Sequence, residues 1–265
     1  MTYKNPTPHN TMNSSPNMTN MFRPIHIVTL AALLTTGVQA HAATITASEN
    51  TYVHRNNSDR DESQEIQVKA EGDGNSRRAY LRFDTSTITN TLTSATLDLH
   101  FNNSVSSGTM HVWGLVDVTD TTGSNATNEA TWGTDLIWNN KPEGDNSSPN
   151  DVIPDPPAAN TLANMTSSPL GELTLSDSLD GTDLSVTLEH LDLQSLLNDD
   201  TNNQITLLLS LSSGSDTSSQ VEIASLANTG GNRVPQLSFT QVPEPSAFAL
   251  IAGCFGLTWV MLRRR

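Results

Sequence analysis

The strongest constraint on the fold is a period-two alternation of apolar and polar residues. In the clearest segment Ala95, Leu97, Leu99 and Phe101 alternate with Thr96, Asp98 and His100. Because successive side chains of a β-strand point to opposite faces, this segment predicts a strand with one face in a core. A chain made of such segments must pack one apolar sheet face against another.

Short apolar segments of this kind recur along the chain and are separated by Asn, Gly and Ser, which favour turns. They predict strands at 45–47, 51–54, 65–69, 79–83, 95–101, 110–116, 172–175, 184–188, 204–211, 221–226 and 236–239. Leu193, Leu196 and Leu197 have helical spacing and predict one short helix that ends at the polar residues 198–200. The expected fold is all-β, a two-sheet antiparallel sandwich of the jelly-roll type.

Charge and cysteine content exclude several classes of protein. The 265 residues carry 13 Lys and Arg against 28 Asp and Glu, a formal net charge of -15. A nucleic-acid partner is excluded, because a phosphate backbone is bound by clustered basic residues that this chain lacks. The single cysteine, Cys254, lies in a C-terminal apolar run. The rest of the chain therefore has no thiol for a disulfide, a zinc ribbon or a Cys nucleophile.

Residues 1–42 are predicted to be an N-terminal extension that ends in a secretory signal peptide. An apolar stretch at 25–38 follows Arg23, and the small residues 40–42 provide an Ala-x-Ala cleavage site for signal peptidase. Cleavage is expected before Ala43, with cleavage after Ala40 as the second choice. The alternative is a buried helix of the folded domain.

The C-terminal segment 242–265 contains three elements in a fixed order. The sequence Pro243-Glu244-Pro245 is followed by a largely apolar run to Leu262 and then by Arg263, Arg264 and Arg265. The run is close to the lower limit of about 17 to 25 residues for a membrane-spanning helix, and the arginines should remain cytoplasmic. A C-terminal transmembrane helix is therefore expected, with the domain outside the cell.

This tail resembles the PEP-CTERM sorting signal of Gram-negative bacteria, whose motif and basic end match Pro243-Glu244-Pro245 and the three arginines. The resemblance implies processing by a membrane-embedded exosortase. The protein would be held transiently in the inner membrane and then pass to the cell surface or an exopolysaccharide matrix. An ordinary single-pass anchor is the alternative.

Residues 43–241 form the expected folded domain, and the Pro-, Asn- and Ser-rich segment 139–169 is expected to be a long flexible loop. The segments 77–84, 94–99, 138–142 and 235–237 resemble, in this order, those of DNRLRE-type domains. The resemblance implies a β-sandwich of surface proteins, including carbohydrate-binding modules that recognise acidic polysaccharides such as alginate. The family's usual Trp-x-Glu segment is not matched at Trp132, which is followed by Gly-Thr-Asp.

The candidates for ligand contact are the basic and aromatic side chains Arg77, Arg78, Tyr80, Arg82 and Trp113. Aromatic rings stack on sugar faces, and guanidinium groups bind hydroxyls and carboxylates. Alternation places Tyr80 and Arg82 on one face of their strand and the apolar residues 81 and 83 on the other. Trp113 is expected to be exposed. The alternative is that the arginines pair with the protein's own carboxylates, such as Glu71 and Asp84.

Two metal sites are considered. A hairpin of 95–101 with 110–116 would place His100 opposite His111 and close to Asp98, although a solvated histidine pair is the alternative. Separately, Asp177, Asp180 and Asp183 supply oxygen ligands of the kind that calcium takes, and calcium is the one cofactor considered.

No catalytic constellation stands out, so a non-catalytic role is expected. The sequence predicts an exported surface or matrix protein whose β-sandwich binds extracellular polysaccharide. Two alternatives remain open. One is a structural adhesin that binds no glycan, and the other is a polysaccharide-degrading enzyme.

Overall fold

The structure is a computed structural model of the chain, and it describes residues 40–54, 65–69, 76–105, 108–117, 165–176, 179–211, 219–228, 233–242 and 245–263. The strands form one compact unit, Gln39–Glu244, and the C-terminal helix belongs to a second unit. The first strand begins at His41, near the end of the predicted signal peptide. Residues 1–39 of that segment and most of the predicted loop at 139–169 lie outside the described residues. So do Asp177, Pro243, Glu244, Arg264 and Arg265.

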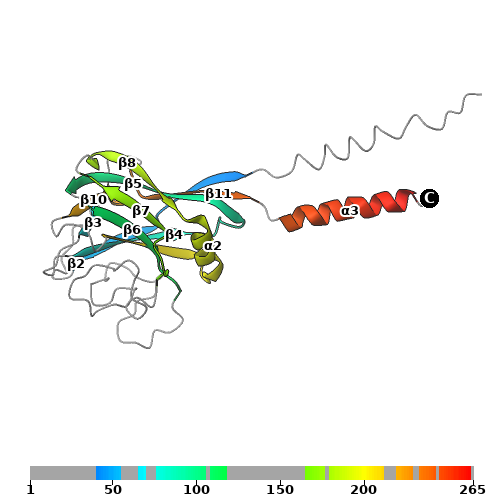
Figure 1. The fold of residues 1–265 in the computed structure, drawn as a ribbon, viewed down its shortest axis with the longest axis horizontal. Helices are drawn as coiled ribbons and strands as arrows, with labels where there is room; N and C mark the ends of the chain where they lie inside the picture. The colour runs from blue at the N-terminus through cyan, green and yellow to red at the C-terminus, as the bar shows by residue number, and fades with distance from the viewer. Residues whose placement is uncertain are drawn as a thin grey trace, which may run out of the picture. The chain divides into compact units, whose positions relative to one another are not determined.

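All eleven predicted strands are present, and the structure extends most of them at their ends (Figure 1). They are β1 His41–Thr46, β2 Glu49–His54, β3 Glu65–Lys69, β4 Arg77–Asp84, β5 Thr91–Val105, β6 Gly108–Gly114, β7 Gly171–Leu175, β8 Thr182–Leu188, β9 Gln204–Leu211, β10 Gln220–Ala224 and β11 Gln236–Val242. The predicted helix is α2, His190–Asp199, and the C-terminal helix is α3, Pro245–Arg263.

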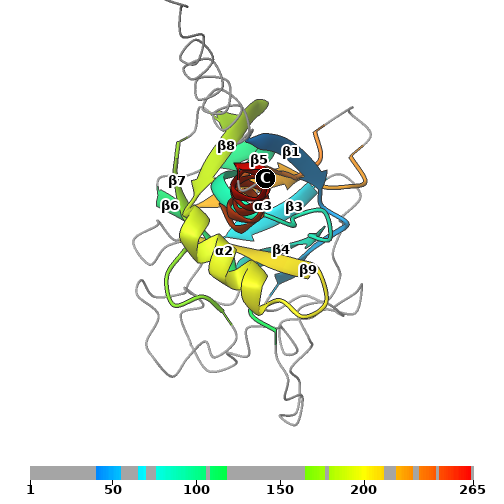
Figure 2. The same ribbon diagram turned by 90° about the vertical axis from the view of Figure 1, so that its right-hand side faces the viewer.

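The strands form a single antiparallel sheet in the order β1-β11-β5-β10-β3-β4-β9-β6-β7, with β2 paired to β4 and β8 paired to β5. The sheet curls, so that β8, β5 and β1 lie above β3, β4 and β9 in Figure 2. The all-β, antiparallel prediction is confirmed. In the strand pairing, β10 and β3 connect the two halves of the curl, so that both halves belong to one continuous sheet.

One apolar core fills the interior of the curl. It takes Leu97, Leu99 and Phe101 from β5, Leu81 and Phe83 from β4, and further residues from most of the other strands. The period-two alternation therefore predicts the buried face of these strands correctly. The helix α2 buries Leu193 and Leu196 in the same core, which explains the helical spacing of these leucines.

Two glycines allow neighbouring elements to pack closely around the core. Gly114 in β6 faces α2, and a Cβ atom there would lie 2.5 Å from Leu196 Cδ2. Gly171 in β7 faces β8, and a Cβ atom there would lie 2.6 Å from the backbone oxygen of Thr187. Gly171 thus lets β7 approach β8, the contact that brings the two halves of the curled sheet together.

The predicted hairpin between 95–101 and 110–116 is wrong. One edge of β5 pairs with β8, and the other pairs with β11 and then with β10. Both edges of β5 are therefore occupied, and β6 pairs instead with β7 and β9. His100 lies opposite Asp183, whereas His111 lies between Ser210 and Glu172. The two histidines do not form the predicted pair.

In the second unit α3 begins at Pro245 and presents exposed large apolar side chains, among them Phe255, Leu257 and Trp259. No helix in the described part of the chain combines the length and the apolar character needed to cross a membrane. The transmembrane helix expected at 242–265 is therefore not confirmed.

Candidate functional site

Four of the five predicted ligand residues share one face of the sheet. Arg78, Tyr80 and Arg82 alternate with the core residues of β4, as predicted, and Trp113 of β6 lies on the same side. Across the intervening strand β9, Leu208 stands in register with both Tyr80 and Trp113. The structure therefore brings these four side chains to one surface of β4, β9 and β6, here called the arginine face.

The arginine face is buried. Tyr80 and Trp113 are 0% exposed and belong to a second apolar cluster with Val53, Leu115, Met165 and Leu208. Arg78 is 2% exposed, and Arg82 is 6% exposed. The expectation that Trp113 is exposed is wrong. Side chains buried this deeply offer little surface to a polysaccharide, and ligand contact by them stays a prediction.

The polar groups of the arginine face bind other parts of the protein. Arg82 Nη1 lies 2.8 Å from Glu49 Oε2, an ion pair between β4 and β2. Trp113 Nε1 donates to Ser210 Oγ at 3.0 Å, and the Trp113 ring meets His111 edge-to-face with centroids 5.8 Å apart. The alternative interpretation, that the arginines pair with the protein's own carboxylates, is thus confirmed for Arg82, which pairs with Glu49.

Arg77 is separate from the other predicted residues. Its Nη1 donates to Gln67 Oε1 of β3 and, at 3.4 Å, to Gln220 Oε1 of β10. Gln220 in turn donates to Glu222 Oε1 at 2.7 Å. Arg77 therefore belongs to a polar cluster where β3 and β10 meet, and its polar contacts hold the sheet together at the point where it curls.

The other half of the sheet has an open polar face. On β1, β11, β5 and β8 the residues that alternate with the core residues are small hydroxyl side chains, amides and carboxylates. This open face consists of Thr44, Thr46, Ser94, Thr96, Asp98, His100, Asp183, Ser185, Thr187, Gln236, Ser238 and Thr240. All of these residues except His100 are at least partly exposed.

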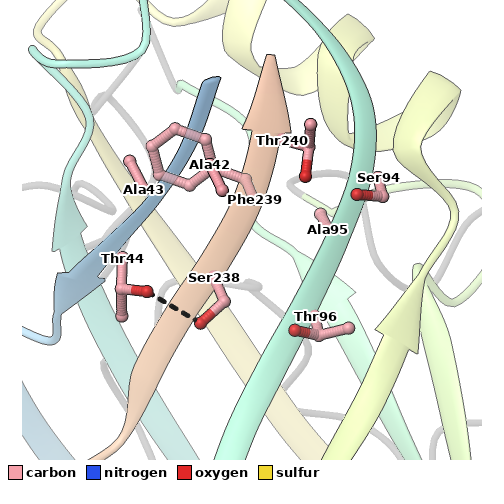
Figure 3. A pocket seen from close by; sticks show the side chains of 9 residues that line it. All are labelled: Ala42, Ala43, Thr44, Ser94, Ala95, Thr96, Ser238, Phe239 and Thr240. Carbon is pink, nitrogen blue, oxygen red and sulfur yellow. Dashed lines mark hydrogen bonds between the residues drawn. The ribbon is translucent and has the colours of Figure 1, made fainter. Parts of the chain in front are cut away.

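Two pockets lie along this open face. The first, of about 370 Å³, is lined by residues of β1, β5 and β11, and Figure 3 shows Thr44, Ser238 and Thr96 side by side across the three strands. The second, of about 260 Å³, is lined by Asp98, His100, Asp183, Ser185, Arg233 and Gln236 with their neighbours. From Ser94 to His100 the strand rises about 20 Å, so the two pockets follow one another along β5.

A hydrogen-bonded ladder crosses the open face between the pockets. Ser238 Oγ donates to Asp98 Oδ2 at 2.6 Å, and Ser185 Oγ donates to Asp98 Oδ1. Thr44 Oγ1 and Ser238 Oγ are 3.1 Å apart, and because Ser238 gives its proton to Asp98, Thr44 donates to Ser238. The ladder spans β1, β11, β5 and β8 and fixes the Asp98 carboxylate.

Next to the ladder, a histidine and a carboxylate form a pair. His100 Nδ1 lies 2.6 Å from Asp183 Oδ1; the His100 side chain is 3% exposed and that of Asp183 is 84% exposed. The Nε2 atom of His100 is buried without a hydrogen-bond partner. Asp183 is one of the three predicted calcium ligands, but in the structure it binds this histidine.

Within the described residues no three His, Cys, Asp or Glu side chains are grouped closely enough to hold a metal ion. Asp177 lies outside that part of the chain, so the predicted set of Asp177, Asp180 and Asp183 is not tested as a whole. Calcium binding stays a prediction.

Sequence reasoning did not select the open face. Ser185, Arg233, Gln236 and Ser238 come from segments more than 80 residues away from Asp98, and no local motif links them. Alternation marks Ser185, Gln236 and Ser238 as outward residues of their strands, and Arg233 precedes β11. Only the pairing of β5 with β8 and β11 brings these residues together.

Comparison with known proteins points to the chemistry of these faces. The family model of carbohydrate-binding module family 96 matches residues 41–160. None of the curated proteins matches the chain. The matched segment begins with β1 and includes β4, a strand of the arginine face, and β5, a strand of the open face. This part of the chain is thus similar to a carbohydrate-binding β domain.

Proposed function

We propose that the β domain binds polysaccharide without catalysing a reaction on it. The observation that carries this proposal is the match of residues 41–160 to carbohydrate-binding module family 96. The predicted jelly-roll sandwich belongs to the same proposal, since such folds offer a broad sheet face to a long polymer.

The open face is the better of the two candidate sites. It is exposed, whereas the arginine face is buried, and its hydroxyl, amide and carboxylate groups can donate to and accept from sugar hydroxyls. Its two pockets lie in line along β5, which suits an extended chain molecule. Predicted contact through Arg77, Arg78, Tyr80, Arg82 and Trp113 is retained as the competing site.

Affinity gel electrophoresis of the full chain in gels containing different polysaccharides tests the proposal. We expect retardation by at least one polymer and loss of this retardation in Thr96→Leu, which removes a hydroxyl and narrows the first pocket. Thr87→Leu, an exposed turn residue outside both pockets, is the matched control. No retardation by any polymer would favour the structural adhesin, and release of shortened products would favour the enzyme.

Export and sorting belong to the proposal as well. We infer that a signal peptide directs secretion and that exosortase processes the tail, which would bring the domain to the cell surface or matrix. The order of the tail supports this, because α3 begins at Pro245, the last residue of the Pro-Glu-Pro motif, and ends at Arg263.

The mass of the protein made in a Gram-negative host with an exosortase tests the sorting proposal. We expect the wild-type chain to lose its tail and the variant Pro243→Ala/Glu244→Ala to keep it. Ser246→Ala is the neighbouring control and should be processed like the wild type. A tail retained in the wild-type chain would instead indicate an ordinary anchor.

A further inference from the structure

The pocket at Asp98, Asp183 and Arg233 also indicates what kind of glycan the open face accepts. This inference rests on the proposed function and deepens it. The DNRLRE resemblance implies that the ligand is an acidic polysaccharide. The carboxylates of this pocket, in contrast, favour a ligand without negative charge. The relevant groups lie on β5, β8 and the segment that leads into β11.

The Asp98 carboxylate is held in place and still has capacity to accept hydrogen bonds. It accepts one hydrogen bond from Ser238 and one from Ser185. An ionised carboxylate offers about four lone-pair sites, so about two remain for donors from outside. Since the ladder fixes the Asp98 side chain in advance, this side chain loses little entropy when two hydroxyl groups of a ligand donate hydrogen bonds to it.

Arg233 provides the complementary donors. It is exposed, and within the described part of the chain it has no ion pair or hydrogen bond, although Asp98 and Asp183 line the same pocket. A guanidinium has five N–H donors and no acceptor. The pocket therefore combines free acceptors and free donors, which is the requirement of a sugar hydroxyl, since a hydroxyl both donates and accepts.

A second, independent observation supports a ligand at this position. His100 lines the pocket at 3% exposure, and its Nε2 atom has no hydrogen-bond partner, although its Nδ1 atom binds Asp183. Buried polar atoms are nearly always hydrogen-bonded in folded proteins. His100 therefore places a polar atom without a hydrogen-bond partner in a residue that lines the pocket.

The charge of the pocket selects against acidic polymers. Two carboxylates face one guanidinium, and the whole chain has a net charge of -15. A uronate chain would bring repeated negative charges close to Asp98 and Asp183, within the screening length of about 8 Å at physiological salt. One arginine can pair with one uronate group, but the remaining carboxylates of the polymer and of the protein repel each other.

We propose that the pocket of Asp98, Asp183 and Arg233 is a subsite for an uncharged, hydroxyl-rich sugar unit, so that the ligand of this domain is a neutral polysaccharide. Asp98 and Asp183 accept from the sugar hydroxyls, and Arg233 donates to them. Binding through hydroxyl groups alone should depend only weakly on salt, in contrast to the attraction of an acidic polymer to a basic surface.

The test uses the full chain in affinity gels that contain either neutral polymers (a β-glucan, a xylan and a galactomannan) or acidic ones (alginate and polygalacturonate). We expect a neutral polymer to retard the wild-type chain, and dissociation constants at about 50 and about 500 mM salt to differ by less than about twofold. Arg233→Gln should weaken binding about tenfold or more, because the exposed side chain loses its positive charge and keeps only the two N–H donors of an amide in place of five.

Asp98→Asn tests the acceptor, and Asp192→Asn on the exposed side of α2 is its charge-matched control. Because Asp98 links several strands, thermal melting checks whether Asp98→Asn is folded like the wild type. If this variant does not fold, Arg233→Gln alone tests the inference. Retardation by acidic polymers alone would overturn this inference and leave the proposed function standing. Normal binding by Arg233→Gln would also overturn it, and no retardation by any polymer would overturn both.

Discussion

At the scale of single residues, Asp84 provides a local pH probe at the end of β4. The side-chain and backbone hydrogen bonds from Ser86 lower the pKa of this exposed carboxyl below its ordinary value of 3.8. Because the folded pKa is depressed, these bonds stabilise the fold above the ordinary pKa, and their contribution is lost as the pH falls through the folded pKa.

Ser86→Ala should therefore raise the pKa of Asp84 toward 3.8, because it removes the side-chain bond, the largest cause of the shift. An NMR titration of the Asp84 carboxyl carbon measures this directly. The backbone bond remains in the variant, so a partial return is expected. An unchanged pKa would contradict the assignment.

A substitution of Arg82 distinguishes between the two roles considered for the arginines, which are a structural role and ligand binding. Its ion pair with Glu49 and its burial indicate a structural role, whereas the ligand prediction gives it a surface role. Arg82→Ala should lower the free energy of unfolding by about 1–3 kcal/mol, because it removes a charged hydrogen bond and the packing of the arginine stem.

Urea unfolding of Arg82→Ala and of the exposed Arg233→Ala checks this prediction, and only the first should show a lower midpoint. Loss of polysaccharide retardation by Arg82→Ala with unchanged stability would instead support the ligand role of the arginine face.

At the scale of elements, β7 and β8 depend on a glycine contact. In Gly171→Ala the new Cβ atom would lie 2.6 Å from the backbone oxygen of Thr187, and a backbone atom cannot move away cheaply. Gly114→Ala meets the end of the Leu196 side chain, which is flexible. We expect Gly171→Ala to cost about 1–3 kcal/mol and Gly114→Ala to cost less. Thermal melting of both variants gives the order, and the reverse order would contradict the close approach of β7 to β8.

The positions of the strands and of the helix along the sequence were largely predictable, but the pairing of the strands was not. Alternation and turn residues depend on each segment alone, so β5, β9 and α2 are found close to where the sequence predicts them. The partners of β5 depend on competition for its two edges among β8, β10 and β11. The predicted hairpin with β6 ignored this competition, and the predicted pairing of His100 with His111 was therefore wrong.

At the scale of the whole molecule, the two units should differ in their importance for folding. Within the described part of the chain, the residues of the main core lie between Ala43 and Phe239. A chain that ends at Glu244 should therefore keep the melting temperature of the full chain. A chain that ends at Val234 lacks β11, which pairs with both β1 and β5, and should lose cooperative unfolding. Calorimetry distinguishes the two, and a large shift for the first truncation would contradict the division into units.

The sequence by itself determined the strands, the buried side of each strand, the helix α2 and the acidic character of the chain, because these follow from local periodicity and composition. Only the tertiary structure decided which outward faces are open. Arg78, Tyr80 and Arg82 are outward residues of β4 just as Asp98 is of β5, yet the first three are buried and Asp98 lines an open pocket. Alternation specifies a side of the strand, whereas exposure depends on atoms from distant parts of the chain.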